Sequence, residues 1–126
     1  MKKKLTNSQK ERFAEARRLY EAGDLAGELK IRKALANSNP ENSILRATLG
    51  KTLWDTGNLI GAERELRVAT GLAPRAEGLS LGLFHVLWDQ DLQVEAVKEA
   101  DRFLSVAHSK EYSALLKKLK AQSGHK

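Results

Sequence analysis

The feature that most constrains this chain is an internal repeat with a period of 34 residues. Its two tryptophans, Trp54 and Trp88, stand 34 residues apart, and each occurs in the tripeptide Leu-Trp-Asp. The two prolines, Pro40 and Pro74, keep the same interval. So do further small or apolar residues: Gly23 with Gly57, Leu49 with Leu83, and Ala62 with Ala96. Agreement at so many positions indicates a repetitive architecture in which each unit stacks on the next.

Within one repeat, the apolar residues have the spacing of two helices. Leu45, Leu49 and Leu53 step by four residues along one helix face. Gly57 ends this helix, because glycine readily adopts the left-handed conformation that follows many helices. A second apolar stripe follows, and Pro74 closes it. The pattern predicts three helix pairs, at residues 8–22 with 25–37, 42–56 with 59–71, and 76–89 with 92–107.

Residues 43–76, SILRATLGKTLWDTGNLIGAERELRVATGLAPRA, resemble a tetratricopeptide repeat. Characteristic positions of that family are filled by Leu49, Gly50, Leu53, Gly57, Asn58, Leu59, Ala62, Leu66, Ala69 and Pro74. The resemblance implies an all-α, right-handed α-α superhelix of three helix pairs and a capping helix. We expect one domain over residues 8–122, with repeats at about 9–42, 43–76 and 77–108 and a cap at about 109–122. A basic tail at 1–7 and a short tail at 123–126 would flank it.

The outer repeats depart from the family pattern. In the first repeat, the family's small residue after the turn falls on Glu28, whereas the small residue is Gly27. We therefore expect one residue to be deleted in that turn and restored before Pro40. In the third repeat the turn glycine is missing, so this turn is also predicted to be one residue shorter. Phe84 occupies a position that is Ala16 and Gly50 in the earlier repeats.

A seventh helix is predicted after the third repeat. Tyr112, Leu115, Leu116 and Leu119 form one apolar stripe, and Ser109 can cap its start. A repeat stack needs such a cap, because its last helix pair has no neighbour to cover it. An amphipathic helix lying on a membrane surface is the alternative for this segment.

The formal net charge of +6 is concentrated at the two ends of the chain. Lys2, Lys3 and Lys4 supply three positive charges, and residues 109–126 carry an excess of four, which leaves a net charge of −1 for residues 5–108. Basic ends of this kind are typical of solvated tails. Attraction of these ends to RNA or another polyanion is the alternative.

Three columns of side chains are predicted along the first helices of the repeats. The core position passes through Leu19, Leu53 and Leu87, and the next residue lies about 100° further round each helix. The columns are basic (Arg17, Lys51, His85), aromatic (Tyr20, Trp54, Trp88) and acidic (Glu21, Asp55, Asp89). Within one helix, Arg17 can pair with Glu21 and Lys51 with Asp55.

The resemblance implies that these columns line a concave groove that holds a peptide segment or a partner helix. Aromatic anchors flanked by charged residues suit such a protein-binding surface. The alternative for the aromatic residues is that they only pack between neighbouring helices. The clamp that binds a terminal carboxylate in some family members is not supported, because its positions hold Phe13, Arg17, Thr48, Gly78 and Gly82, of which only Arg17 is basic.

Few residues suggest catalysis. The chain has no cysteine, and His85, His108 and His125 lack metal-ligand spacing, so we expect no metal, no cofactor and no enzymatic activity. No apolar run is long enough to span a membrane, and a cytoplasmic location is expected. The sequence therefore predicts a protein-interaction module, such as a bacterial adaptor, secretion chaperone or immunity-type protein, that is a monomer or weak homodimer. A nucleic-acid partner is disfavoured, and a self-associating structural subunit is the remaining alternative.

Overall fold

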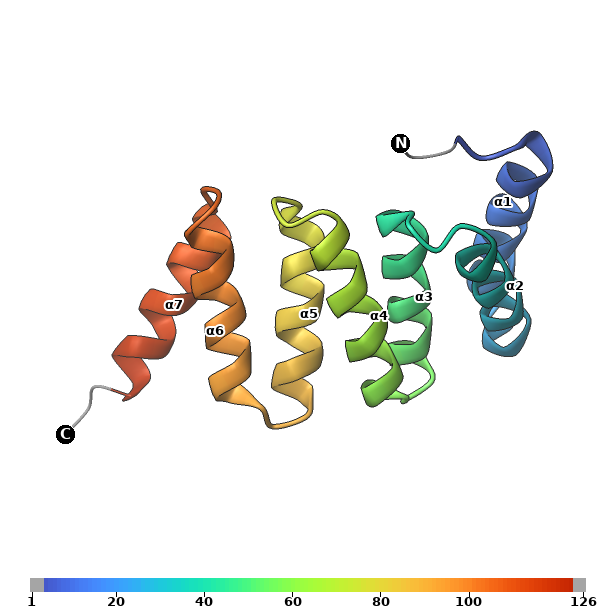
Figure 1. The fold of residues 1–126 in the computed structure, drawn as a ribbon. Helices are drawn as coiled ribbons and strands as arrows, with labels where there is room; N and C mark the ends of the chain where they lie inside the picture. The colour runs from blue at the N-terminus through green and yellow to red at the C-terminus, as the bar shows by residue number, and fades with distance from the viewer. Residues whose placement is uncertain (1–3, 124–126) are drawn as a thin grey trace.

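The computed structural model describes residues 4–123, which form seven α-helices joined by short turns (Figure 1). The helices are α1 Asn7–Glu21, α2 Leu25–Ser38, α3 Ser43–Asp55, α4 Leu59–Leu72, α5 Glu77–Asp89, α6 Gln93–Leu104 and α7 Lys110–Ser123. They stand in a row, with α1 and α2 at one end and α7 at the other (Figure 1). No β-strand occurs in residues 4–123. The predicted all-α stack of three helix pairs and a capping helix is confirmed.

The turns inside the three repeats have the same backbone geometry. A left-handed residue stands in each of them, namely Gly23 (φ 81°), Gly57 (φ 87°) and Asp91 (φ 64°). The N–H of the next residue donates in each case to the carbonyl of a core leucine, at 2.8–3.0 Å: Leu19, Leu53 and Leu87. Equivalent residues are 34 positions apart throughout, so the three turns have equal length. The predicted loss of one residue from the first and third turns is wrong.

The presence of glycine at position 27 is explained by the helix cap next to it, and it does not mark a deletion in the turn. The N–H of Gly27 donates to the capping side chain of Asp24 at 2.9 Å, and Gly61 donates to Asn58 at 2.8 Å. A Cβ on either glycine would lie only 2.6–2.7 Å from that capping side chain, so a larger residue would force the cap to shift. The position equivalent to Ala62 is therefore Glu28.

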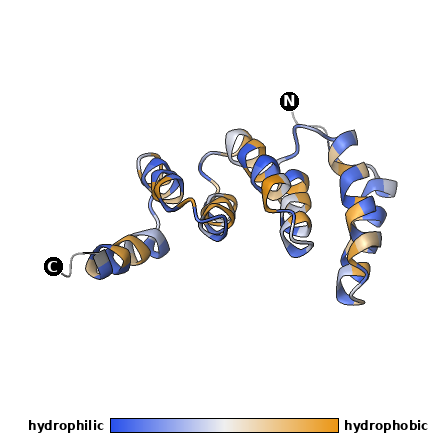
Figure 2. Ribbon diagram, turned by 90° about the horizontal axis from the view of Figure 1, so that it is seen from below, coloured by the Kyte–Doolittle hydropathy of each residue, from blue (hydrophilic) through white to orange (hydrophobic). Residues whose placement is uncertain are grey.

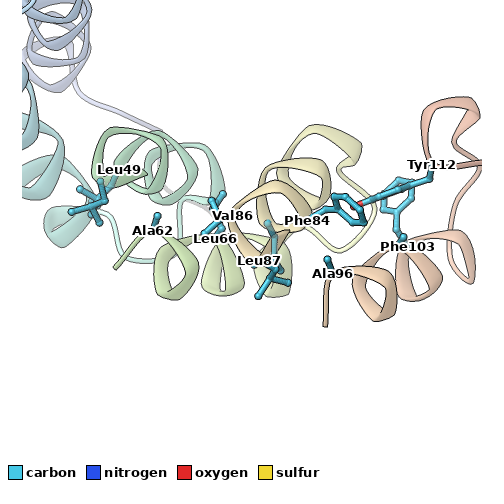
Figure 3. Packing of buried hydrophobic residues seen from close by; sticks show 13 residues of the cluster. Leu49, Ala62, Leu66, Phe84, Val86, Leu87, Ala96, Phe103 and Tyr112 are labelled. Carbon is cyan, nitrogen blue, oxygen red and sulfur yellow. The ribbon is translucent and has the colours of Figure 1, made fainter. Parts of the chain in front are cut away.

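Apolar side chains from α2 to α7 form one core that runs along the row (Figure 3). A smaller cluster joins α1 and α2 to the start of α3, through Ala16, Ile31, Leu35 and Leu45. In Figure 2, hydrophobic residues predominate in α5, which lies between α4 and α6 and also contacts α3. Because burial of apolar area is the main favourable term in folding, each helix pair depends on its neighbours for stability.

The capping helix α7 covers the end of the core through Tyr112, which is fully buried. The Tyr112 ring contacts Phe84 of α5 and Phe103 of α6, with centroid distances of 5.8 and 5.7 Å. Leu115, Leu116 and Leu119 are partly buried against the same core. Phe84 is thus larger than its counterparts in earlier repeats because it reaches the cap. The predicted stripe of α7 thus packs against the end of the core.

Polar groups also attach α7 to the third repeat. The N–H of Tyr112 donates to Ser109 Oγ at 3.0 Å, as predicted for a capping serine, and Ser109 in turn donates to Glu77 of α5. The Tyr112 hydroxyl lies 2.8 Å from Ser80 Oγ, and Ser80 donates to Glu99 at 2.6 Å. These bonds fix the register of α7 against α5 and α6.

The folded domain begins before residue 8. α1 starts at Asn7, and Thr6 caps it by accepting a hydrogen bond from the Gln9 N–H at 3.1 Å. Leu5 packs against the smaller core cluster. The predicted boundary of the basic tail is therefore wrong by a few residues. Residues 1–3 and 124–126, with the lysines among them, lie outside the described residues.

Within residues 4–123, none of the helices combines the length and the apolar character that crossing a bilayer requires.

Truncation of a core leucine is expected to be costly. Leu53→Ala removes a buried side chain from the main core and should lower the free energy of unfolding by about 2–5 kcal/mol. Lys118→Ala, at an exposed position of α7, should change it by no more than about 0.5 kcal/mol. Urea titration followed by circular dichroism measures both values. Equal values for the two variants would contradict the assignment of Leu53 to the core.

Tyr112 should titrate at unusually high pH. Burial raises the pKa of Tyr112 from its ordinary 10 to about 12, and the nearby Glu99 carboxylate adds to this against the opposing effect of the Ser80 hydrogen bond. The pKa of Tyr112 is higher in the folded state than in the unfolded state. The stability gained by burying the neutral Tyr112 hydroxyl is therefore fully present below pH 10 and is lost between pH 10 and about 12.

The measurement is the ultraviolet absorbance of tyrosinate in the variant Tyr20→Phe, in which Tyr112 is the one remaining tyrosine. Its absorbance should rise near pH 12, together with loss of helical signal. Tyr112→Phe is the matched variant for the stability measurement, and its unfolding free energy should fall less between pH 10 and 12. Titration of Tyr112 at its ordinary pKa would show that the ring is not buried beneath the cap.

Candidate protein-binding groove

A cavity of about 260 Å³ opens between α1 and α3, with α2 forming one wall. Backbone contacts join each helix to the next and α3 to α5, but among the described helices they do not join α1 to α3. The first and second repeats are therefore spread apart at this point. The residues that line the cavity are Phe13, Arg17, Tyr20, Glu21, Glu28, Arg32, Thr48, Lys51, Thr52 and Asp55.

The rim of this cavity contains predicted members of all three columns. They come from α1 and α3, and they are Arg17, Tyr20, Glu21, Lys51 and Asp55. The expected pairs within each helix are present, with Arg17–Glu21 at 3.8 Å and Lys51–Asp55 at 3.2 Å. Lys51 Nζ also lies 5.4 Å from the centre of the Tyr20 ring, so the two repeats meet through a cation–π contact.

The side chains at the rim are exposed to solvent, and their ion pairs are weak. Tyr20 is 47% exposed, and the side chains of Arg17 and Lys51 are 74% and 62% exposed. Exposed ion pairs of this kind contribute at most about 1 kcal/mol, because water screens them. Such pairs can exchange their partner for a charge on a bound molecule at little cost.

Two buried charges that sequence reasoning missed line the inner wall of the cavity. Arg32 Nε donates to Glu28 Oε2 at 2.7 Å, and Thr52 Oγ from α3 donates to the same oxygen at 3.1 Å. The side chains of Arg32 and Glu28 are only 9% and 4% exposed. Arg32 also lies over the Phe13 ring at 5.3 Å. The sequence does contain a sign of this pair, because Glu28 stands where the second repeat has the small, apolar Ala62.

The remaining predicted groove residues, Trp54, His85, Trp88 and Asp89, do not line the cavity. Trp54 is half-buried against the main core, and its Nε1–H donates to Asp89 Oδ2 of α5 at 2.9 Å. Trp88 stacks on Phe84 with centroids 5.7 Å apart and also packs on the core. His85 is exposed, with its ring edge-on to Phe84.

Charged residues of one repeat thus contact the aromatic residue of the repeat before it, once through the basic column and once through the acidic column. Lys51 reaches back to Tyr20, and Asp89 reaches back to Trp54. Both tryptophans make substantial packing contacts, whereas Tyr20 keeps more of its ring accessible. No group of three or more potential metal-ligating residues occurs in the described part of the chain.

Known proteins resemble this chain in structure rather than in sequence. No protein-family model matches it, and no curated protein matches it. The first TPR of Spaghetti (RPAP3), bound to the HSP90 peptide SRMEEVD, superposes with a TM-score of 0.75 at 14% identity, over 92% of this chain and 95% of that chain. The Yersinia enterocolitica type III secretion chaperone SycD, in complex with a peptide of the translocator YopD, gives 0.76 at 14% identity, over 93% and 90%.

A mutant of MamA gives a TM-score of 0.70 at 16% identity, over 83% of this chain and 77% of that chain. Together with the seven helices and the 34-residue period, these similarities establish a tetratricopeptide-repeat fold for the chain.

The buried ion pair gives a test by substitution. Glu28→Ala leaves Arg32 buried without its carboxylate and should lower the free energy of unfolding by roughly 3–5 kcal/mol. The double substitution Glu28→Ala with Arg32→Leu introduces the Ala62 and Leu66 pair of the second repeat, and it should restore stability to about the wild-type value or above. Urea titration of the wild type, the single variant and the double variant measures these stabilities. A double variant as unstable as the single variant would contradict this account of the ion pair.

Proposed function

We propose that this protein is a protein-interaction module that binds a segment of another protein in the groove between α1 and α3. The observation that carries the proposal is the cavity of about 260 Å³, whose rim combines the exposed Tyr20 ring with Arg17, Lys51, Glu21 and Asp55. An accessible aromatic anchor amid exchangeable charges is the composition that favours protein binding.

Two proteins of the same fold support this proposal. The first TPR of Spaghetti is described with an HSP90 peptide, and SycD with a peptide of YopD. Three positions of the family's carboxylate clamp line the cavity here, but they hold Phe13, Arg17 and Thr48. A single basic residue among them disfavours a terminal carboxylate as the ligand. We therefore assign the groove to an internal segment of the partner.

The proposed cellular role is that of an adaptor, secretion chaperone or immunity-type protein in the cytoplasm, without enzymatic activity. All three roles require a groove that holds another protein, and none requires chemistry at the site. The oligomeric state that fits such a role is a monomer or weak homodimer, since the groove must stay open to its partner.

The test is selection of ligands from a random peptide library displayed on phage, followed by titration of a synthetic selected peptide. Tyr20→Ala should weaken binding by roughly 2 kcal/mol, because it removes the accessible aromatic anchor. Lys51→Glu should also weaken binding, since it reverses the charge beside that ring. Tyr20 is a cleaner test than Trp54, whose indole is hydrogen-bonded and packed on the core.

Lys118→Glu is the matched control for charge reversal, because Lys118 is exposed on α7, far along the chain from the groove. All variants must retain wild-type helicity and melting temperature. If a selected peptide binds the groove variants normally but loses affinity on removal of Lys2, Lys3 and Lys4, the basic end carries the interaction and the proposal fails. Steep loss of binding with added salt would accompany that result.

A further inference from the structure

The buried ion pair beside the groove has hydrogen-bonding capacity that the protein does not use. Glu28 Oε2 accepts from Arg32 and Thr52, but Glu28 Oε1 has no hydrogen-bond partner. Arg32 Nη1 likewise has none. Both side chains are more than nine-tenths buried, and both line the cavity. Buried polar groups are nearly always hydrogen-bonded, so one free acceptor and one free donor in a single cavity wall require an explanation.

Packing of the repeat does not supply this explanation. The positions equivalent to Glu28 and Arg32 hold Ala62 and Leu66 in the second repeat and Ala96 and Ala100 in the third, all of them buried. The fold is therefore built with apolar residues at these positions elsewhere in the same chain. A buried ion pair is seldom more stabilising than apolar residues of similar volume. The pair is thus better explained by what it can bind.

The charges around the cavity restrict the chemistry of the ligand. Three cationic side chains (Arg17, Arg32, Lys51) are balanced by three anionic ones (Glu21, Glu28, Asp55). A carboxylate placed against the wall would gain Arg32 but be repelled by Glu28. An ammonium group would gain Glu28 but be repelled by Arg32. A neutral group that presents an acceptor and a donor together satisfies both free atoms.

A primary amide is such a group, since it carries a carbonyl oxygen and an NH₂ on one carbon. Both free atoms are themselves covered in this structure, so a ligand reaches them only when neighbouring side chains move aside. The amide oxygen then accepts from Arg32 Nη1 while its NH₂ donates to Glu28 Oε1. Phe13 and Tyr20 line the same cavity and offer apolar contact to the methylene groups that precede the amide. The Thr52 hydroxyl has two acceptors within reach, Glu28 Oε2 at 3.1 Å and the Thr48 carbonyl at 3.0 Å, and Thr48 donates to the Leu45 carbonyl. Neither hydroxyl donor therefore competes for the amide oxygen.

We propose that the Glu28–Arg32 pair is a specificity site that binds the side-chain amide of a glutamine or asparagine in the protein segment held by the groove. This inference rests on the proposed function and specifies the ligand of the same site. Recognition by a buried donor and acceptor is selective, because a ligand lacking the amide leaves both protein atoms unpaired.

The experiment uses the full chain and the phage-displayed peptide library. Peptides selected on the wild-type protein should carry glutamine or asparagine at one fixed position. One such peptide is synthesised with glutamine, glutamate or methionine there, since methionine keeps the length and glutamate keeps the shape of the end group. The wild-type protein should bind the amide peptide at least about tenfold more tightly than either replacement, as expected for two hydrogen bonds to buried charged groups.

The matched variant is Glu28→Ala with Arg32→Leu, which reproduces the second repeat at these positions. It should lose most of the preference and bind the glutamine and methionine peptides with similar affinity. The comparison among peptides on the wild-type protein stands by itself should the variant fail to fold.

The outcomes separate this inference from the proposed function. Selected peptides that require Tyr20 and Lys51 but show no amide preference would overturn the inference and leave the groove as the binding site. A preference for glutamate would overturn it as well, as would equal amide selectivity in the double variant. Failure to select any peptide that depends on Tyr20 or Lys51 would overturn both.

Discussion

Apolar contacts between successive helix pairs hold this protein together, because no pair buries its hydrophobic stripe alone. The main core passes from Ala36 in α2 to Tyr112 in α7 without interruption, and every helix contacts the next. The 34-residue period keeps the buried faces in register along the row. Phe84 and Tyr112 complete the core at its far end, where a further helix pair would otherwise be needed.

The first repeat departs from this apolar pattern at a single place, and the departure coincides with the groove. Glu28 and Arg32 replace alanine and leucine, and the cavity opens between α1 and α3 on the face that they line. In the second and third repeats, α3 and α5 contact each other directly. A scaffold of repeated helix pairs therefore supplies stability, while one altered pair of positions places a buried ion pair in the wall of the cavity.

The rim of the groove is built by contacts that cross from one repeat to the next. Lys51 covers the Tyr20 ring, and Asp89 accepts the Trp54 N–H. These contacts orient the aromatic side chains differently. Trp54 and Trp88 pack against the core and are partly buried, whereas the Tyr20 ring remains accessible at the cavity. A column of similar residues in the sequence thus divides into two tryptophans that pack against the core and one tyrosine that stays accessible.

The sequence by itself determined the helix pairs, their 34-residue register, the apolar stripe of α7 and the columns on the first helices, because these follow from local periodicity and capping preferences. It misplaced the first and third turns, because Gly27 lies beneath the Asp24 cap and Asp91 adopts the left-handed conformation of Gly57. It also missed the buried Glu28–Arg32 pair. Only the tertiary structure decided which helices separate, which aromatic residue stays exposed and which charges are buried, since these depend on contacts between residues distant in the chain.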